Sequence, residues 1–162
     1  MKLHPRCYEV LFDRVSATAR HVITVDHAHG HDGTITPHGP GASDHALALI
    51  RAMIAAAKCD GRITDDERER LLDRIGCAEF DPDVQDWLQR EFRSPLDLEA
   101  VAAGAHGSHR RAVELYIASV TAIDLDRPEE FAWLGKLAAT MGLEAPLVAA
   151  IHSKLGVPAP VG

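Results

Sequence analysis

The amino-acid sequence predicts an all-α fold, a compact helical bundle built around two long central helices. Apolar residues recur at helical spacing, and capping residues, prolines or glycines mark where each helix should begin and end. From residue 42 onward, no run shows the apolar and polar alternation of a strand. An internal pseudo-repeat supports the same class: an apolar helix, an acidic turn and an amphipathic helix occupy residues 46–76 and recur after residue 108.

The first long helix should end near Cys59 and be buried along most of its surface. Ser43 can cap its first turn, where the negative charge of Asp44 also suits the helix dipole. Asp44, Arg51 and Lys58 are spaced by seven and predict one narrow solvent-exposed stripe. The remaining circumference is apolar, as in a helix buried in a bundle. Arg51 and the short length, about 17 residues, argue against a membrane span.

The first acidic turn follows this helix and reverses the chain. Gly61, next to Asp60, offers a positive φ at low cost, which a helix C-terminus commonly needs. Thr64 and Glu67 form a capping box that should open the next helix. Gly76 should end that helix.

The remaining helices are predicted from the same signals. Asp81-Pro82, Ser94-Pro95, Gly107-Ser108, Asp126 with Glu129, and Pro146 predict helices at about 82–92, 95–104, 109–123, 128–141 and 146–155. The two long helices should bury Ile50 and Ile54 against Ile117 and Val120.

The chain is expected to divide into three parts. Residues 1–41 should contain an amphipathic helix over 5–20, followed by a histidine-rich segment that forms either a short hairpin or a disordered loop. Residues 42–156 should form the helical domain, and residues 157–162 a frayed tail.

Composition excludes several classes of protein. The 162 residues suit one domain, and the 46% hydrophobic and 25% charged residues are ordinary for a soluble globular protein. The net charge of −7 argues against a general nucleic-acid binder. Three cysteines without framework spacing favour reduced thiols, and residues 1–20 contain no signal-peptide core. We therefore expect a cytoplasmic protein.

Two acidic motifs and the segment between them resemble a known family. The runs AKCDGRITDDE (57–67) and AIDLDRPEE (122–130) resemble the TerB-like superfamily. The run SPLDLEAVAAG (94–104) is similar to the YebE-like branch, a domain of unknown function. The resemblance covers about residues 42–156 and implies an all-helical domain related to tellurite-resistance and stress proteins, in which acidic residues hold a divalent cation.

By motif, the resemblance assigns that cation to five residues: Asp60 and Glu67 in the first turn, and Asp124, Asp126 and Glu130 in the second. The chain departs from the pattern in two places. Leu125 stands where an Asp-Gly pair would place glycine. A histidine-rich segment replaces the membrane-associated N-terminal region that the YebE-like branch often has, which puts membrane association in doubt.

Two readings of the acidic turns are open. Their carboxylates and turn carbonyls are the hard oxygen ligands that calcium or magnesium prefers, although the glycine spacing is not that of an EF-hand. Alternatively, Thr64, Glu67, Asp126 and Glu129 only cap helices. Asp60 favours the first reading, because its charge is unfavourable at a helix C-terminus.

The histidine-rich segment offers an alternative metal site. His27, His29 and His31 alternate along the chain, so in a strand they would face one side and could hold zinc, copper or nickel. The competing reading is a flexible polar loop that binds metal adventitiously.

Three function hypotheses follow. The first is a non-enzymatic TerB-like module that binds a protein partner or itself, regulated by a divalent cation or not. The second is a metal-handling protein or metal-dependent enzyme that uses the N-terminal histidines. The third is a structural oligomerisation domain. Catalysis has little support, because the sequence contains no phosphate-binding loop and no hydrolase or zinc-protease motif.

Overall fold

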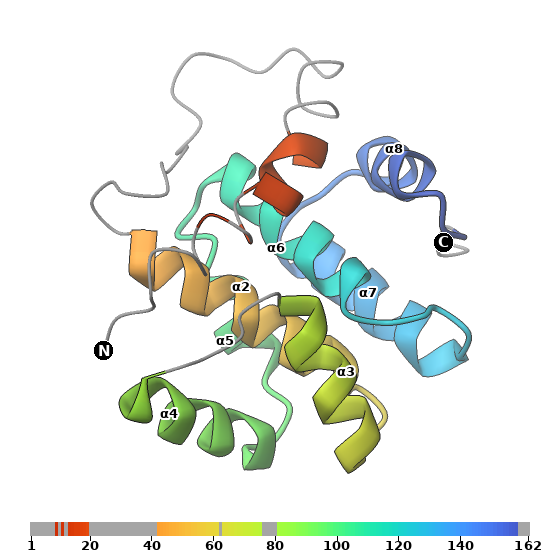
Figure 1. The fold of residues 1–162 in the computed structure, drawn as a ribbon. Coiled ribbons are helices and arrows are strands. Elements are labelled where there is room, and N and C mark those ends of the chain that lie inside the picture. Colours follow the sequence, from red (N-terminus) through yellow and green to blue (C-terminus); the bar gives the residue numbers. More distant parts are fainter. Residues whose placement is uncertain are drawn as a thin grey trace.

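The computed structural model describes residues 9, 11, 13–19, 42–61, 63–75 and 81–158. Within these ranges the chain is helical and contains no strand, which confirms the all-α prediction. The named helices are α2 (Ala42–Ala57), α3 (Asp65–Ile75), α4 (Pro82–Arg93), α5 (Leu98–Ala103), α6 (His109–Thr121), α7 (Pro128–Thr140) and α8 (Ala145–Leu155) (Figure 1). A shorter helical segment, 13–19, precedes α2. None of the helices in the described ranges is both long and apolar enough to cross a bilayer.

Local capping accounts for most helix boundaries. The side-chain oxygen of Ser108 accepts a hydrogen bond from the backbone N–H of Arg111, and Thr64 accepts one in the same way from Glu67. Gly156 ends α8 with a φ of 70°, a left-handed value that glycine adopts without strain. The predicted helix at 95–104 begins later than expected, at Leu98, because Asp97 is its N-cap.

The two long helices form the centre of the bundle. α2 and α6 run side by side through the middle of the molecule and share its most extensive helix contact (Figure 1). Ile50 and Ile54 of α2 are buried against the core, as are Ile117 and Val120 of α6, all at 2% exposure or less. The prediction of a buried apolar seam between these helices is confirmed.

The core extends beyond residues 42–156. Leu11, Val15 and Ala19 are buried in the same core cluster as α2 and α6. At the other end, Val157 packs against the core, and the carbonyl of Pro158 accepts a hydrogen bond from His152. Both ends of the described chain are therefore attached to the bundle.

Candidate functional site

The two acidic turns meet in one pocket. The turns after α2 and α6 lie together because those helices pack side by side, and they line a pocket of about 230 Å³. The structure brings all five acidic residues named from the sequence to it: Asp60, Glu67, Asp124, Asp126 and Glu130. Arg70 and Arg74 of α3 and Arg127 before α7 complete its charged lining.

The two turns share a backbone feature although their sequences differ. Gly61 in the first turn has a φ of 93°. Leu125, the residue that follows Asp124 in the second turn, has a φ of 51° and is 5% exposed. The second turn therefore reaches a left-handed conformation without glycine, and burial of the leucine side chain offsets the backbone strain.

Arginines connect the turns reciprocally. Arg127, which follows the second turn, places its Nη1 2.8 Å from Oδ2 of Asp60 in the first turn. Arg74, on the helix that follows the first turn, places its Nη2 2.5 Å from Oδ1 of Asp124 in the second. Arg70 lies 3.9 Å from the other oxygen of Asp124. Each leading aspartate is thus paired with an arginine from the other unit.

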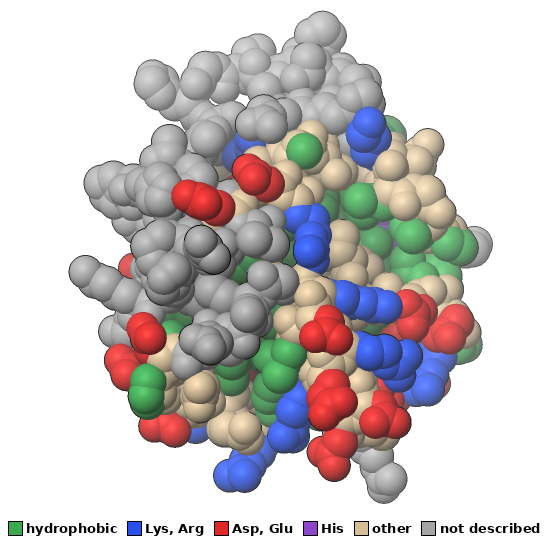
Figure 2. Space-filling view, viewed as in Figure 1, with side chains coloured by type: hydrophobic (Ala, Val, Ile, Leu, Met, Phe, Trp, Pro, Cys, Tyr) green, Lys and Arg blue, Asp and Glu red, His purple; other side chains and the backbone are tan. Residues whose placement is uncertain are grey.

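These pairs shape the electrostatics of the pocket. The hydrogen bond and the charge of Arg74 lower the pKa of Asp124, so this carboxyl stays ionised. Figure 2 shows acidic and basic side chains intermingled over α3 and the surface beside it. Five carboxylates and three guanidinium groups line the pocket, so negative charge is in excess.

Two further groups in the pocket have raised pKa values. Burial raises the pKa of Glu130, although its Oε1 accepts hydrogen bonds from the backbone N–H groups of Asp126 and Arg127. The capping partner of α7 is therefore Glu130, one residue later than the predicted Glu129. Burial, followed by the charges of Glu130 and Asp60, raises the pKa of Cys59 to about 11, so this residue is a neutral thiol and a poor nucleophile.

The carboxylate oxygens of the pocket suit a hard cation, but in this structure three of the carboxylates are bonded to protein groups. Among the described residues, no group of three or more His, Cys, Asp or Glu side chains is placed to hold a metal ion. Asp60 and Asp124 are bound to arginines, and Glu130 is bound to backbone N–H groups. Cation binding would require Arg74 or Arg127 to leave its aspartate. His27, His29 and His31 lie outside the described residues.

The structure also contains a buried polar cluster that sequence reasoning missed. Oε1 of Glu114 lies 3.1 Å from Nε2 of His45, and Oε2 accepts a hydrogen bond from the hydroxyl of Ser16. Arg110 lies one helical turn before Glu114, 3.7 Å away. One carboxylate therefore joins the first helical segment, α2 and α6. The sequence feature that could have indicated this cluster is Glu114 itself, a charged residue among apolar neighbours in α6.

The comparison with known proteins gives a family. No curated protein and no solved structure matches the chain. One family model, described as "Protein of unknown function (DUF533)", matches residues 14–155. This range includes α2 to α8, both acidic turns and the arginines that join them. Because the match extends over most of the sequence, the chain belongs to the DUF533 family.

Proposed function

We propose that this chain is a TerB-like module of the YebE-like branch that binds a protein partner in a stress-related, cytoplasmic role, under the control of a divalent cation. The observation that carries the proposal is the meeting of both acidic turns in one pocket. The motifs around Asp60 and Asp124 support the TerB-like assignment. The raised pKa of Cys59, the thiol among the described residues of the pocket, makes it a poor nucleophile and favours binding over catalysis.

The arginine pairs suggest how a cation could control binding. Asp60, Glu67 and Asp124 would supply oxygen ligands, together with Asp126 or Glu130 from the same pocket. Calcium or magnesium would neutralise the excess negative charge there. Arg74 and Arg127, no longer paired with aspartates, would then present guanidinium groups to an acidic surface of the partner.

Thermal melts with added ions test the cation. A bound ion stabilises the native state by RT ln(1 + [L]/Kd), about 2.7 kcal/mol at a hundredfold excess over Kd. We expect calcium or magnesium to raise the melting temperature of the wild type and a chelator to reverse this. The double variant Asp60→Asn with Glu67→Gln should lose the shift. The matched control, Asp65→Asn with Asp66→Asn, removes two exposed charges outside the pocket and should keep it.

The results separate the hypotheses. Absence of any shift with calcium and magnesium would reject cation control at the acidic turns. A zinc shift that disappears when residues 21–38 are deleted would move the site to His27, His29 and His31.

Binding of a protein partner is measured separately from cation binding. Sedimentation velocity with calcium and with chelator reports self-association, and affinity capture under the same two conditions reports other partners. Capture that is equal in both conditions, and equal in the Asp60→Asn, Glu67→Gln variant, would separate partner binding from the acidic turns.

A further inference from the structure

The predicted solvent stripe on α2 ends in a buried lysine. Asp44 at the start of the stripe is exposed and Arg51 is partly exposed, as expected. Lys58 at its end is only 8% exposed, so the prediction of a solvent-exposed stripe is wrong at this residue. The C-terminal end of α4 and the linker to α5 lie over it, as its contacts with Glu91 and Ser94 show.

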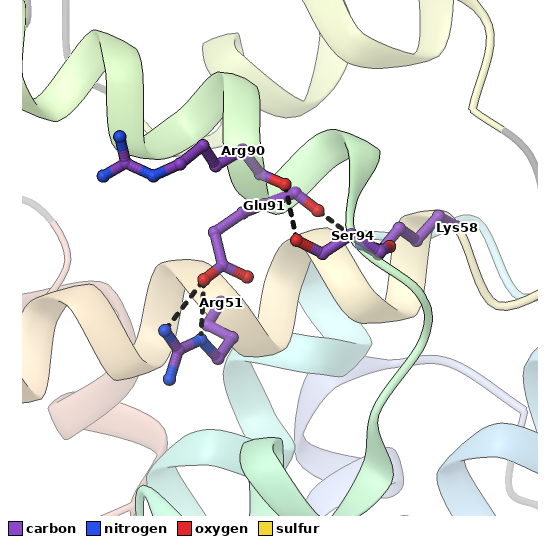
Figure 3. Close-up of polar contacts among 5 residues, drawn as sticks. All are labelled: Arg51, Lys58, Arg90, Glu91 and Ser94. Atoms are coloured by element: carbon purple, nitrogen blue, oxygen red, sulfur yellow. Dashed lines mark hydrogen bonds and ion pairs between the residues drawn. The ribbon is translucent and has the colours of Figure 1, made fainter.

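Among the residues that the structure describes, Lys58 bonds to backbone carbonyls and not to a carboxylate. Its Nζ donates to the carbonyl oxygen of Glu91 and, at 2.6 Å, to that of Ser94 (Figure 3). The Glu91 carboxylate is instead paired with Arg51, whose Nη2 lies 2.8 Å from Oε1. An ammonium group has three N–H donors, so the described residues supply acceptors for two of them. Burial lowers the pKa of Lys58, although the charge of Glu91 partly opposes this.

A cavity of about 400 Å³ lies beside this ammonium group. Its apolar lining comes from Ile54 and Ala55 of α2, Val101 of α5 and Leu96 of the linker. Leu96 is the exposed large hydrophobic residue of the described chain, at 37% exposure. The volume is typical of small-molecule sites, which combine an apolar lining with a few fixed polar groups.

We propose that this cavity binds a small aliphatic carboxylate. A buried cation is costly unless it is paired, and among the described residues Lys58 bonds only to carbonyl oxygens. The two carboxylates in the cavity lining have other partners: Glu91 pairs with Arg51, and Asp97 accepts from the backbone N–H of Ala100. The carboxylate of the ligand would accept the third N–H of Lys58, and its chain would contact Ile54, Ala55 and Val101. The site shares no lining residue with the acidic-turn pocket, so the two proposals can fail independently.

Isothermal titration calorimetry of the full chain with octanoate tests the proposal. We expect saturable binding to one site, at least tenfold tighter than the binding of octan-1-ol, which has the same chain without the charge. Lys58→Met should weaken octanoate at least tenfold and remove the preference over octanol. The matched control, Lys136→Met, makes the same change at an exposed lysine of α7 and should bind octanoate as the wild type does.

A second variant tests the cavity in case Lys58→Met does not fold. Ala100→Leu adds a side chain inside the cavity lining and leaves Lys58 in place, and it should weaken octanoate at least tenfold. Circular dichroism reports whether each variant is folded. Absence of saturable octanoate binding, equal binding of octanol, or wild-type affinity in a folded Lys58→Met protein would overturn the proposal. If Lys58→Met does not fold, wild-type affinity in Ala100→Leu would overturn it.

Discussion

A buried tyrosine–histidine pair joins α6 to α8 and gives a prediction with two independent readouts. Oη of Tyr116 lies 2.6 Å from Nε2 of His152, and Nδ1 of His152 lies 2.7 Å from the carbonyl oxygen of Pro158. A carbonyl can only accept, so Nδ1 carries the proton and donates to Pro158. Burial lowers the pKa of His152 and so favours the neutral ring, in which Nε2 is the acceptor and the tyrosine hydroxyl donates to it. The contact with Pro158 thus fixes the tautomer of the neutral imidazole, with the proton on Nδ1.

Tyr116→Phe removes the hydroxyl and leaves a buried acceptor without a donor. Both rings are at most 1% exposed, so water cannot easily replace the hydroxyl. An unsatisfied buried polar group costs about 1–3 kcal/mol, and we expect this loss in the free energy of unfolding at pH 7.5. Urea denaturation followed by circular dichroism measures it. Thr140→Val is the control, because it removes an exposed hydroxyl and should change stability by less than about 0.5 kcal/mol.

The pH dependence of stability tests the neutral state of His152. Burial lowers its pKa in the folded protein, while the hydrogen bond to Pro158 partly opposes this. The unfolded chain therefore binds the proton first, at a pKa of about 6.5. The stability contribution is present above that pH and is lost as the pH falls toward the lower folded pKa.

His152→Asn removes this titration, so the stability difference from the wild type should shrink as the pH falls from 8 to 5. One proton limits the change to about 1.4 kcal/mol per pH unit. A difference that is constant over this range would refute the neutral, buried imidazole. A wild-type value for Tyr116→Phe at pH 7.5 would refute the hydrogen bond as a stabilising contact.

Three further predictions concern the core and the turns. Ile117→Ala should cost about 2–5 kcal/mol in a urea titration, through lost burial and a residual cavity, and a loss below 1 kcal/mol would contradict its place in the central seam. Leu125→Gly should destabilise by about 0.5–2 kcal/mol in the same assay, because lost burial exceeds the relief of backbone strain, and a gain in stability would contradict this balance. A double-mutant cycle on Asp60 and Arg127 should give a coupling of about 0.2–1 kcal/mol that weakens in 0.5 M salt, and zero coupling at low salt would show that the pair does not hold the turns.

The helices could be predicted from the sequence because their ends depend on neighbouring residues. The start of α5 could not, although Ser94-Pro95 is a good local N-terminal signal. Ser94 instead ends α4, with its N–H and hydroxyl both bonded to the carbonyl of Arg90. Its own carbonyl is held by Lys58 of α2. A contact over 36 residues thus favours one of two locally acceptable structures, and no local pattern contains that information.

The candidate site was predictable residue by residue but not as a pocket. Each acidic turn has its own motif, so Asp60 and Asp124 could be named without the fold. Their arginine partners could not, because the pairs join residues 67 and 50 positions apart. The seven-residue spacing predicted that Lys58 is exposed, and this was wrong, because spacing along one helix does not show whether another helix covers it.

The second acidic turn shows why glycine is a poor marker for this repeat. A leucine at positive φ costs about 1 kcal/mol or more, and full burial of its side chain contributes about 1.5–3 kcal/mol. The turn after α6 can therefore keep the same handedness as Gly61 without glycine, provided that Leu125 has a core to enter. The two turns share a leading aspartate, but their capping differs: the backbone N–H of Glu67 donates to Thr64 in the first turn, and the carboxylate of Glu130 accepts from the N–H of Arg127 in the second. The leading aspartate marks the repeat because in both turns it pairs with an arginine of the other unit, whereas the residue at positive φ depends on what surrounds it.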